Sequence, residues 1–311
     1  MWRREPDERE LDGIWERDIR PELYALASPA SRPITVFLGG QPAAGKTSGG
    51  SLVEGAHPGI VPIEGDSFRR YHPDYDALMA SDRLLMPEVT AKAAGYWTGR
   101  AVAEADAKGY SALIEGTWRN AATVLDEAAR AKRLGRGVWA MLVATKPAVS
   151  RAGALARYLS AVVAGADARW TPPEAHDETV RRLPANVPAI AGSGLIDRFT
   201  VVDRSGAVLA DGRDAAGRAR AAGIWRDVYT APLTGEERAA LARLASDLGR
   251  WMRASGEWDE RVRIALHSAT RPVADLLPDA WAAPELDDES NGRWVQNRGG
   301  DGRYRHGGHW E

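Results

Sequence analysis

Residues 40–47 read GQPAAGKT and contain the residue types of a phosphate-binding loop. They fit the pattern G-x-x-x-x-G-K-[ST], in which backbone N–H groups and the positive end of the following helix surround phosphates. Lys46 would reach the β- and γ-phosphates, and the Thr47 hydroxyl would ligate Mg²⁺. The alternative is a glycine-rich turn with an exposed lysine. The residues predicted to bind the nucleotide are Gly40, Gln41, Pro42, Ala43, Ala44, Gly45, Lys46, Thr47 and Ser48.

This loop indicates a nucleoside triphosphate as ligand, but it does not say what the protein does with it. Switch GTPases add an N-K-x-D element, and none of the lysines in this sequence stands in one. The H-R-D and D-F-G elements of protein kinases are also absent from the sequence. A small-molecule kinase and a nucleotide-dependent regulatory module both remain open.

Asp66 follows a predicted strand at residues 60–64, so it should project from the same sheet edge as the phosphate loop. A carboxylate there would accept the proton of an attacking hydroxyl or help to hold the metal. The alternative is a cap on the next turn. Phe68, Arg69 and His72 then follow in an aromatic and basic segment that is long enough to form a substrate loop, with ordinary surface packing as its alternative.

A second polar group follows the third predicted strand, which ends at Glu115. Thr117, Trp118 and Arg119 come directly after it. An acid, a hydroxyl, an aromatic face and a guanidinium together would orient a polyhydroxylated or nucleotide-like acceptor. For Trp118 alone, packing in the core is the commoner role.

The elements that must position these residues alternate between short apolar stretches and helical patterns. This alternation predicts βαβ units and a mostly parallel five-stranded sheet covered on both faces, a three-layer α/β sandwich. We predict strands at 34–38, 60–64, 111–115, 138–144 and 199–203, and helices at 46–55, 88–108, 121–134, 148–163 and 174–192, the last broken near Pro184 and Pro188.

The flanking segments lack this alternation. A helix over residues 8–27, interrupted by Pro21, is predicted to pack outside the core, and Thr234 and Glu237 form a possible capping box for a later helix. The predicted units are an N-terminal helical segment (1–32), the core (33–212), a helical appendage (213–281) and a mobile tail (282–311).

Composition restricts the class of protein. The chain has 311 residues, 44% of them hydrophobic and 27% charged, and a net charge of -2. It has no cysteine, which excludes disulfides and thiol chemistry. The near-neutral charge argues against nucleic acid as the main partner, since phosphate-backbone binding usually requires a basic excess. The charged start and the short apolar runs predict a cytoplasmic protein that does not enter the membrane.

Several segments together resemble the zeta toxin family of P-loop kinases. Their order and spacing match the family over about residues 33–212. The matching segments are LGGQPAAGKTS at 38–48, EGDSFRRYHPDY at 64–75, LIEGTWRN at 113–120, ARYL at 156–159, ARWTPPEAHD at 168–177 and LPANV at 183–187.

The resemblance implies a P-loop kinase fold and a phosphotransferase that uses ATP or GTP with Mg²⁺. The family is best known for phosphorylating the 3′-hydroxyl of the sugar in UDP-N-acetylglucosamine. By this likeness Asp66 is the catalytic base, and Lys46 and Thr47 contact the phosphates and the magnesium ion. Arg157 and Arg169 would stabilise the transferring phosphoryl group. Glu115, Thr117 and Arg119 would line the acceptor site, together with Asp66, Phe68, Arg69 and His72 of the predicted substrate loop.

The sequence departs from the family at one acceptor position. A glutamate that contacts the sugar nucleotide in the toxins has its counterpart near Gly99. Another sugar, nucleotide or antibiotic as acceptor therefore stays open, as does a regulatory NTPase whose 213–281 helices contact a partner. The family is usually restrained by a small helical antitoxin, so we expect either a separate antitoxin or an acceptor too specialised to be toxic. Inhibition in cis by residues 213–311 is a further hypothesis.

Overall fold

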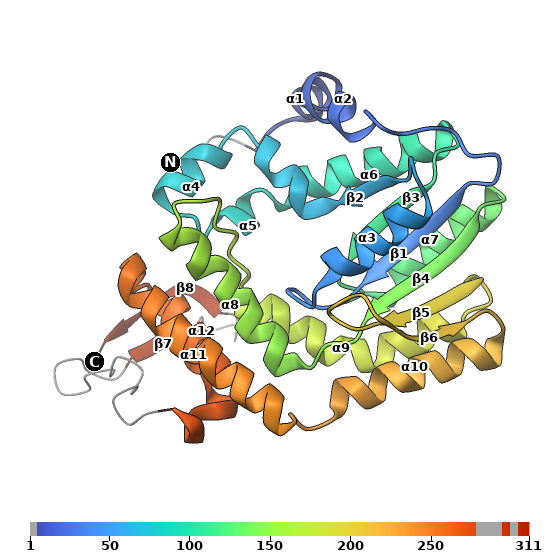
Figure 1. Ribbon diagram of the computed structural model, residues 1–311. Coiled ribbons are helices and arrows are strands. Elements are labelled where there is room, and N and C mark those ends of the chain that lie inside the picture. The colour runs from blue at the N-terminus through green and yellow to red at the C-terminus, as the bar shows by residue number, and fades with distance from the viewer. Residues whose placement is uncertain (1–4, 278–293, 299–303, 311) are drawn as a thin grey trace.

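The computed structural model describes residues 5–277, 294–298 and 304–310 (Figure 1). A six-stranded sheet lies at its centre, with the strand order β2-β3-β1-β4-β5-β6. The first five of these strands are parallel, and β6 runs antiparallel to β5. The strands are β1 (Ile34–Gly39), β2 (Val61–Glu64), β3 (Ala112–Gly116), β4 (Gly137–Val143), β5 (Arg198–Val202) and β6 (Val208–Gly212).

The predicted fold class is therefore confirmed, and the sheet has one strand more than the five predicted. Strand β6 has little apolar signal, because Val208 and Leu209 are both exposed and only Gly212 is buried. It forms by pairing with the edge of β5 rather than by burying a side-chain face. A period-two hydrophobic pattern could not have revealed such a strand.

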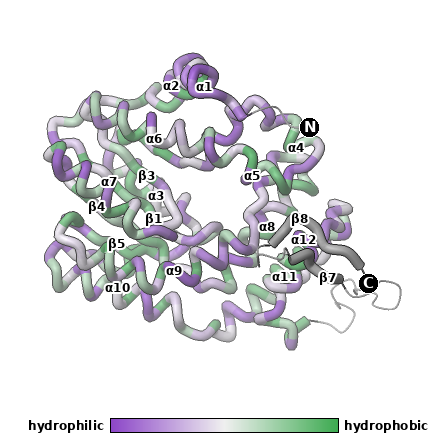
Figure 2. Tube along the Cα trace, turned by 180° about the vertical axis from the view of Figure 1, so that it is seen from behind, coloured by the Kyte–Doolittle hydropathy of each residue, from purple (hydrophilic) through white to green (hydrophobic). Residues whose placement is uncertain are grey.

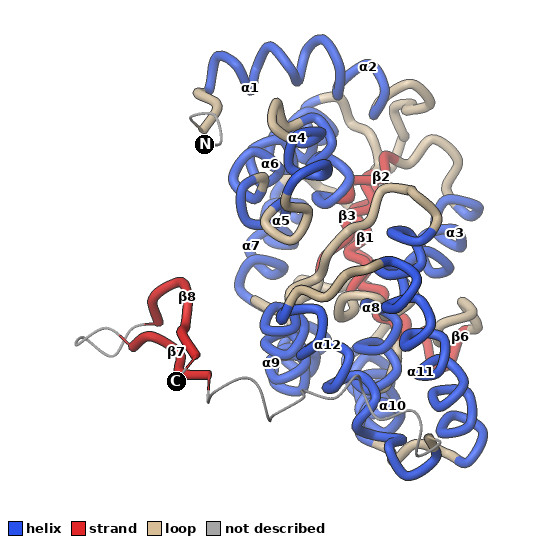
Figure 3. The backbone as a smooth tube through the Cα atoms, turned by 90° about the vertical axis from the view of Figure 1, so that its left-hand side faces the viewer, coloured by secondary structure: helices blue, strands red, loops and turns tan. Residues whose placement is uncertain are grey.

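Helices cover both faces of the sheet, which makes three layers. Alternate side chains of β1 point to opposite faces. Val36 and Leu38 pack with α3 (Lys46–Ala56), and Phe37 packs with the helices of the other face. Those helices are α7 (Ala121–Arg133), α9 (Pro173–Gly192) and α10 (Ala215–Thr230). Figure 3 shows α7 and α3 on opposite sides of the strands, and Figure 2 shows that the strands are among the most hydrophobic parts of the trace.

The N-terminal segment packs on the edge of this core. A π-helix, η1 (Trp15–Ile19), joins α1 (Glu8–Ile14) to α2 (Arg20–Leu23), and Pro21 lies in the first turn of α2. The wider π turn accommodates a proline that would otherwise break the helix. Trp15 is buried, and the indole N–H of Trp97 on α6 (Ala91–Ala107) donates to Leu11 O at 3.0 Å.

The prediction that the 174–192 helix breaks near its prolines is wrong. Helix α9 runs through Pro184 and Pro188 without interruption. Pro184 cannot donate to the carbonyl of Val180, four residues earlier. The hydroxyl of Tyr229, on α10, donates to that Val180 carbonyl at 3.0 Å instead. Tertiary structure thus satisfies the group that the proline leaves unpaired.

The remaining elements connect these layers or follow them. The predicted capping box of α11 (Gly235–Ser255) is present, since Thr234 and Glu237 each bond the other's backbone N–H. Helix α10 packs on β5 and β6, whereas α11 and α12 (Glu260–Thr270) pack on α8 (Pro147–Val163). The elements not yet given are η2 (Gly65–Tyr71), α4 (Tyr75–Ser81), α5 (Met86–Val89), η3 (Arg271–Leu276), β7 (Trp294–Arg298) and β8 (Tyr304–Trp310).

The division of the chain at residues 32, 212 and 281 stays a prediction. Within the tail predicted at 282–311, β7 and β8 pair antiparallel, and the rest of that tail lies outside the described residues. Among the helices of the described ranges, none has the length and apolar character needed to span a membrane.

Candidate functional site

The loop between β1 and α3 has the geometry of a phosphate-binding turn. Gly45 precedes α3 with a φ of 99°, a left-handed conformation that favours glycine. A Cβ on Gly45 would also lie 3.3 Å from the backbone of Arg204, so a side chain there would crowd this backbone. The first turn of α3 begins with Lys46 and Thr47, and its free N–H groups are directed to the loop.

Lys46 bends back over this loop. Its Nζ donates to the backbone oxygens of Gly40 at 3.2 Å and of Gln41 at 3.4 Å. The same ammonium lies 3.5 Å from Oε1 of Glu115, at the end of β3. Phosphate oxygens placed in the loop would replace the two neutral backbone acceptors with charged ones.

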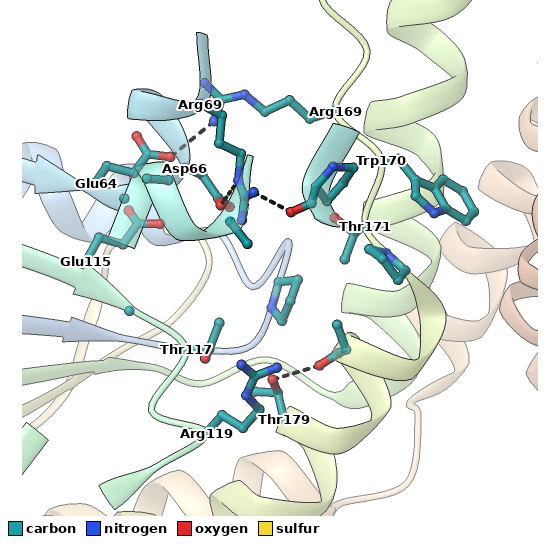
Figure 4. Close-up of a pocket in the computed structure, with 18 of the residues that line it drawn as sticks. Glu64, Asp66, Arg69, Glu115, Thr117, Arg119, Arg169, Trp170, Thr171 and Thr179 are labelled. Carbon is teal, nitrogen blue, oxygen red and sulfur yellow. Dashed lines mark hydrogen bonds and ion pairs between the residues drawn. The ribbon is translucent and has the colours of Figure 1, made fainter. Parts of the chain in front are cut away.

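A cavity of about 530 Å³ opens beside the loop, at the carboxyl ends of β1, β2 and β3. From the predicted nucleotide loop it is lined by Pro42, Ala43 and Lys46. From the predicted acceptor residues it is lined by Asp66, Arg69, Glu115, Thr117 and Arg119. The two arginines predicted to act on the phosphoryl group, Arg157 and Arg169, also line it. Figure 4 shows how Asp66, Glu115, Thr117, Arg119 and Arg169 gather around this space.

The other members of the predicted loop form its frame. The loop and the first turn of α3 contain Gly40, Ala44, Gly45, Thr47 and Ser48, none of which lines the cavity. Gln41 is fully buried, and its Nε2 donates to Thr145 O at 2.7 Å and to Ser150 Oγ at 3.2 Å. Its side chain therefore anchors the loop to the start of α8 and does not face the cavity.

Asp66 is the carboxylate best placed for proton transfer. It lies in the first turn of η2, exposed to the cavity, and its Oδ1 accepts a hydrogen bond from Arg69 Nε at 2.7 Å. Burial alone would raise the pKa of Asp66, but the cations Arg69, Arg169 and Lys46 outweigh this effect and lower it. The carboxylate is therefore ionised at neutral pH.

The two predicted phosphoryl-contacting arginines come from α8 and from the connection to α9. Arg157 Nη2 donates to Thr171 Oγ1 at 3.0 Å, and Arg169 Nη1 lies 3.4 Å from Glu64 Oε1. Burial lowers the pKa of Arg157, and the nearby Arg169 charge adds to this effect. Two guanidiniums that line one cavity favour an anion there.

The end of β3 contributes both polar and structural residues. Burial raises the pKa of Glu115, as do the charges of Glu64 and Asp66, although Lys46 opposes them. Trp118, by contrast, is 3% exposed and packs in the core. A Cβ on Gly39 would lie only 2.3 Å from the Trp118 ring, so the strand needs glycine at this point. The packing role that the sequence left open for Trp118 is confirmed.

Phe68 and His72 do not line the cavity. In the 3₁₀-helix η2, residues three apart share a face, which places Arg69 beside Asp66 and turns Phe68 the other way. Phe68 is 3% exposed and packs in the hydrophobic cluster of α6 and the N-terminal helices. His72 is 5% exposed, and its Nδ1 accepts the backbone N–H of Asp74 at 3.1 Å. The prediction that Phe68 and His72 contact the acceptor is corrected by this geometry.

Two residues of the site were missed from the sequence. Glu64 lines the cavity at the end of β2 and pairs with Arg169. Arg204 follows β5, and its Nη1 donates to Ala43 O of the phosphate loop at 2.8 Å. Burial lowers the pKa of Arg204. Both residues stand at carboxyl ends of parallel strands, and this position is the signal that would have indicated them.

The oxygen groups around the cavity suit Mg²⁺. This ion prefers hard oxygen ligands and usually keeps several waters beside substrate phosphates. Thr47 is exposed in the first turn of α3, and the carboxylates of Asp66 and Glu115 line the cavity. Over the described part of the chain, no group of three or more histidine, cysteine, aspartate or glutamate residues is arranged to hold a metal by itself. A metal here would therefore take few ligands from the protein, and phosphate oxygens and waters would supply the others.

Comparisons with known proteins agree with this architecture. The "Toxin PezT" of Streptococcus pneumoniae is 33% identical over 187 residues, covering 60% of this chain and 74% of the toxin. The "Toxin zeta" of Enterococcus hirae is 30% identical over 193 residues, covering 60% of this chain and 66% of the toxin. A solved structure of the PezAT chromosomal toxin-antitoxin system of S. pneumoniae superposes with a TM-score of 0.68 at 26% identity, covering 80% of this chain and 98% of that one. The family model described as "Zeta toxin" matches residues 22–214, more than half of the sequence, so the chain belongs to the zeta toxin family.

Proposed function

We propose that the protein is a kinase that transfers the γ-phosphate of ATP or GTP to a hydroxyl of a small-molecule acceptor. The observation that carries this proposal is that Asp66 and the cations Lys46, Arg157 and Arg169 line one cavity beside a phosphate-binding loop. A carboxylate beside several cations at a triphosphate site is what phosphoryl transfer to a hydroxyl requires.

In this proposal the loop binds the triphosphate with its backbone N–H groups and Lys46 Nζ. Thr47, together with the phosphates, would hold Mg²⁺, and the ion would neutralise charge at the phosphate oxygens. Arg157 and Arg169 release their contacts with Thr171 and Glu64 and donate to the oxygens of the transferring group. Such an arginine contributes roughly 10³–10⁵ to the rate in phosphoryl-transfer enzymes.

Asp66 is the general base. It accepts the proton of the acceptor hydroxyl as that oxygen forms its bond to the γ-phosphorus, and the bond from this phosphorus to the bridging oxygen breaks. The nucleoside diphosphate leaves with the bridging oxygen. The lowered pKa of Asp66 keeps its carboxylate ionised at neutral pH, which is the state that can accept the proton.

Our best candidate for the acceptor is the 3′-hydroxyl of UDP-N-acetylglucosamine, bound by Glu115, Thr117 and Arg119. Family membership and the shared EGTWR segment at 115–119 support it. Another sugar, nucleotide or antibiotic is the alternative, because residue 99, near the counterpart of the family's sugar-contacting glutamate, is glycine. We also propose that the protein acts in the cytoplasm and is inhibited there by a separate antitoxin, since its solved relative comes from a toxin-antitoxin system.

A phosphate-transfer assay tests this function. Purified protein, Mg²⁺ and γ-labelled ATP or GTP are incubated with a panel of sugar nucleotides, nucleosides and aminoglycosides, with Asp66→Asn in parallel. We expect label on UDP-N-acetylglucosamine from the unchanged protein, and a loss of about 10²–10⁴-fold in Asp66→Asn. Label on another acceptor would keep the kinase and replace the substrate. Nucleotide hydrolysis without a labelled acceptor, unchanged in Asp66→Asn, would instead indicate a regulatory NTPase.

A further inference from the structure

We propose that Arg69 is a positioning residue: it fixes the Asp66 carboxylate for the acceptor and connects that carboxylate to the segment 86–90 in the cavity wall. The inference rests on the proposed function, because it gives Asp66 the role of base. It concerns a residue that touches the base and the cavity wall rather than the nucleotide loop (Figure 4).

Arg69 makes three hydrogen bonds with two parts of the site. Its Nε donates to Asp66 Oδ1 at 2.7 Å. Its Nη1 donates to the backbone oxygen of Pro87 at 2.6 Å and to Thr90 Oγ1 at 2.8 Å. One planar guanidinium therefore joins the base on η2 to a segment that is 18–21 residues further along the chain.

The far side of this connection is anchored in the protein interior. Thr90 is fully buried, and its hydroxyl donates to Met86 O at 2.7 Å while it accepts from Arg69. Met86 and Pro87 line the same cavity as Asp66. An acceptor that contacts this wall would thus meet a surface whose position is tied to the base through Arg69.

The near side fixes the direction of the carboxylate. Asp66 and Arg69 are three residues apart on a 3₁₀-helix, so their side chains project from one face. Arg69 engages Oδ1, and over the described chain no hydrogen bond is found at Oδ2. The second oxygen therefore remains available for the proton of an acceptor hydroxyl, with its orientation already set.

Other charged groups face Asp66, so the effect of Arg69 must be separated from theirs. The cations are Lys46 on α3, Arg157 on α8 and Arg169 before α9, and the acids are Glu64 on β2 and Glu115 on β3. Arg69 is the cation that bonds the carboxylate directly. Its removal should therefore raise the pKa of Asp66 even though the other cations remain.

The test compares Arg69→Lys and Arg69→Gln with the unchanged protein. Arg70→Gln is the matched control, because the neighbouring Arg70 is exposed and pairs with Glu22 and Tyr71 away from the cavity. Arg69→Lys keeps the charge but cannot reach three acceptors, so kcat should fall by about 10² while KM for the nucleotide changes less than about twofold. In Arg69→Gln the acidic limb of the pH profile of kcat/KM should also move to higher pH. Arg70→Gln should change neither quantity.

Two outcomes would overturn the inference. One is full transfer activity in Arg69→Lys and Arg69→Gln. The other is an equal effect on kcat and on the nucleotide KM, with no movement of the acidic limb of the pH profile of kcat/KM, which would indicate a merely structural residue.

A ¹³C NMR titration of the side-chain carboxyls, in which the Asp66 signal is assigned by its loss in Asp66→Asn, gives a measurement that does not need an acceptor. If no acceptor is phosphorylated but Asp66 titrates at higher pH in Arg69→Gln, the proposed function fails and the Arg69 connection stands. An unchanged Asp66 titration would refute the connection itself.

Discussion

Asp66, Lys46, Arg157 and Arg169 reach one cavity from four different parts of the chain. Arg69 is a fourth cation at this carboxylate, and the four cations outnumber the acids Glu64, Asp66 and Glu115 by one, so a triphosphate would meet net positive charge. In the free protein these cations contact backbone oxygens, Thr171, Glu64 and Glu115 at 3.0–3.5 Å. Phosphate oxygens would replace the neutral acceptors, Thr171 and the backbone carbonyls, with charged ones.

At the residue scale we predict that Arg169→Ala lowers kcat by about 10³ or more and leaves the dissociation constant of the nucleotide within a few fold. The reason is that the arginine is expected to bind the phosphoryl group most strongly in the transition state. Single-turnover transfer and nucleotide binding, measured separately, check both parts.

The control for this variant is its partner in the free protein, Glu64. If Arg169 served only to neutralise Glu64, the double variant Glu64→Gln, Arg169→Ala would recover most of the lost activity. Transfer that stays low in the double variant supports a role on the phosphoryl group, whereas recovery would contradict it.

Residue types at strand ends could be predicted from the sequence, but side-chain direction could not. Asp66 and Glu115 follow apolar strands directly, and sheet geometry alone brings them to one edge. Phe68 was misplaced because the turn after β2 is a 3₁₀-helix, whose face pattern no hydrophobic period announces. Arg204 was missed because its contact with Ala43 depends on how the loop after β5 closes over the phosphate loop.

At the element scale, α9 shows how neighbouring helices override local preference. Its two internal prolines would end an isolated helix. Leu183, Val187 and Ile190 are buried on one face and hold it against the sheet, and Tyr229 on α10 supplies a donor for Val180 O. Periodicity predicted the extent of this helix, whereas its continuity depended on a residue 45 positions beyond Pro184 in the sequence.

We predict that Tyr229→Phe lowers the free energy of unfolding by about 0.5–1.5 kcal/mol, because a partly buried carbonyl loses its donor while the ring stacking on Trp225 is kept. Urea unfolding measures the change. Pro184→Ala restores a backbone N–H for Val180 O, so in that background Tyr229→Phe should cost clearly less. Equal costs in both backgrounds would show that the hydroxyl does not compensate for the proline.

At the scale of the whole molecule, the helices after residue 234 support the site without entering it. Within the described chain, no residue of α11 or α12 lines the cavity. Leu155, Tyr158 and Leu159 of α8 pack with these two helices, and Tyr158 donates to Glu257 Oε2 at 3.0 Å. Arg157 lies between Leu155 and Tyr158 on α8 and lines the cavity, so the packing of α11 and α12 supports the helix that carries its guanidinium. For α11 and α12, this arrangement favours a brace over inhibition in cis, whereas the hypothesis for residues 213–311 as a whole stays a prediction.

A substitution in this packing distinguishes a brace from an inhibitor. Leu248 on α11 is fully buried in the cluster with α8, and Leu248→Ala should destabilise the protein by about 2–5 kcal/mol and lower the transfer rate even where the protein remains folded. Ile264→Ala on α12 is the control, since that side chain is 55% exposed, and it should change neither property. Circular dichroism during urea unfolding measures the stability. Nucleotide turnover, measured without urea and well below the unfolding temperature, measures the activity.

An inhibitory appendage predicts the opposite change in activity, because loosening it would raise nucleotide turnover. A faster Leu248→Ala protein would therefore refute the brace.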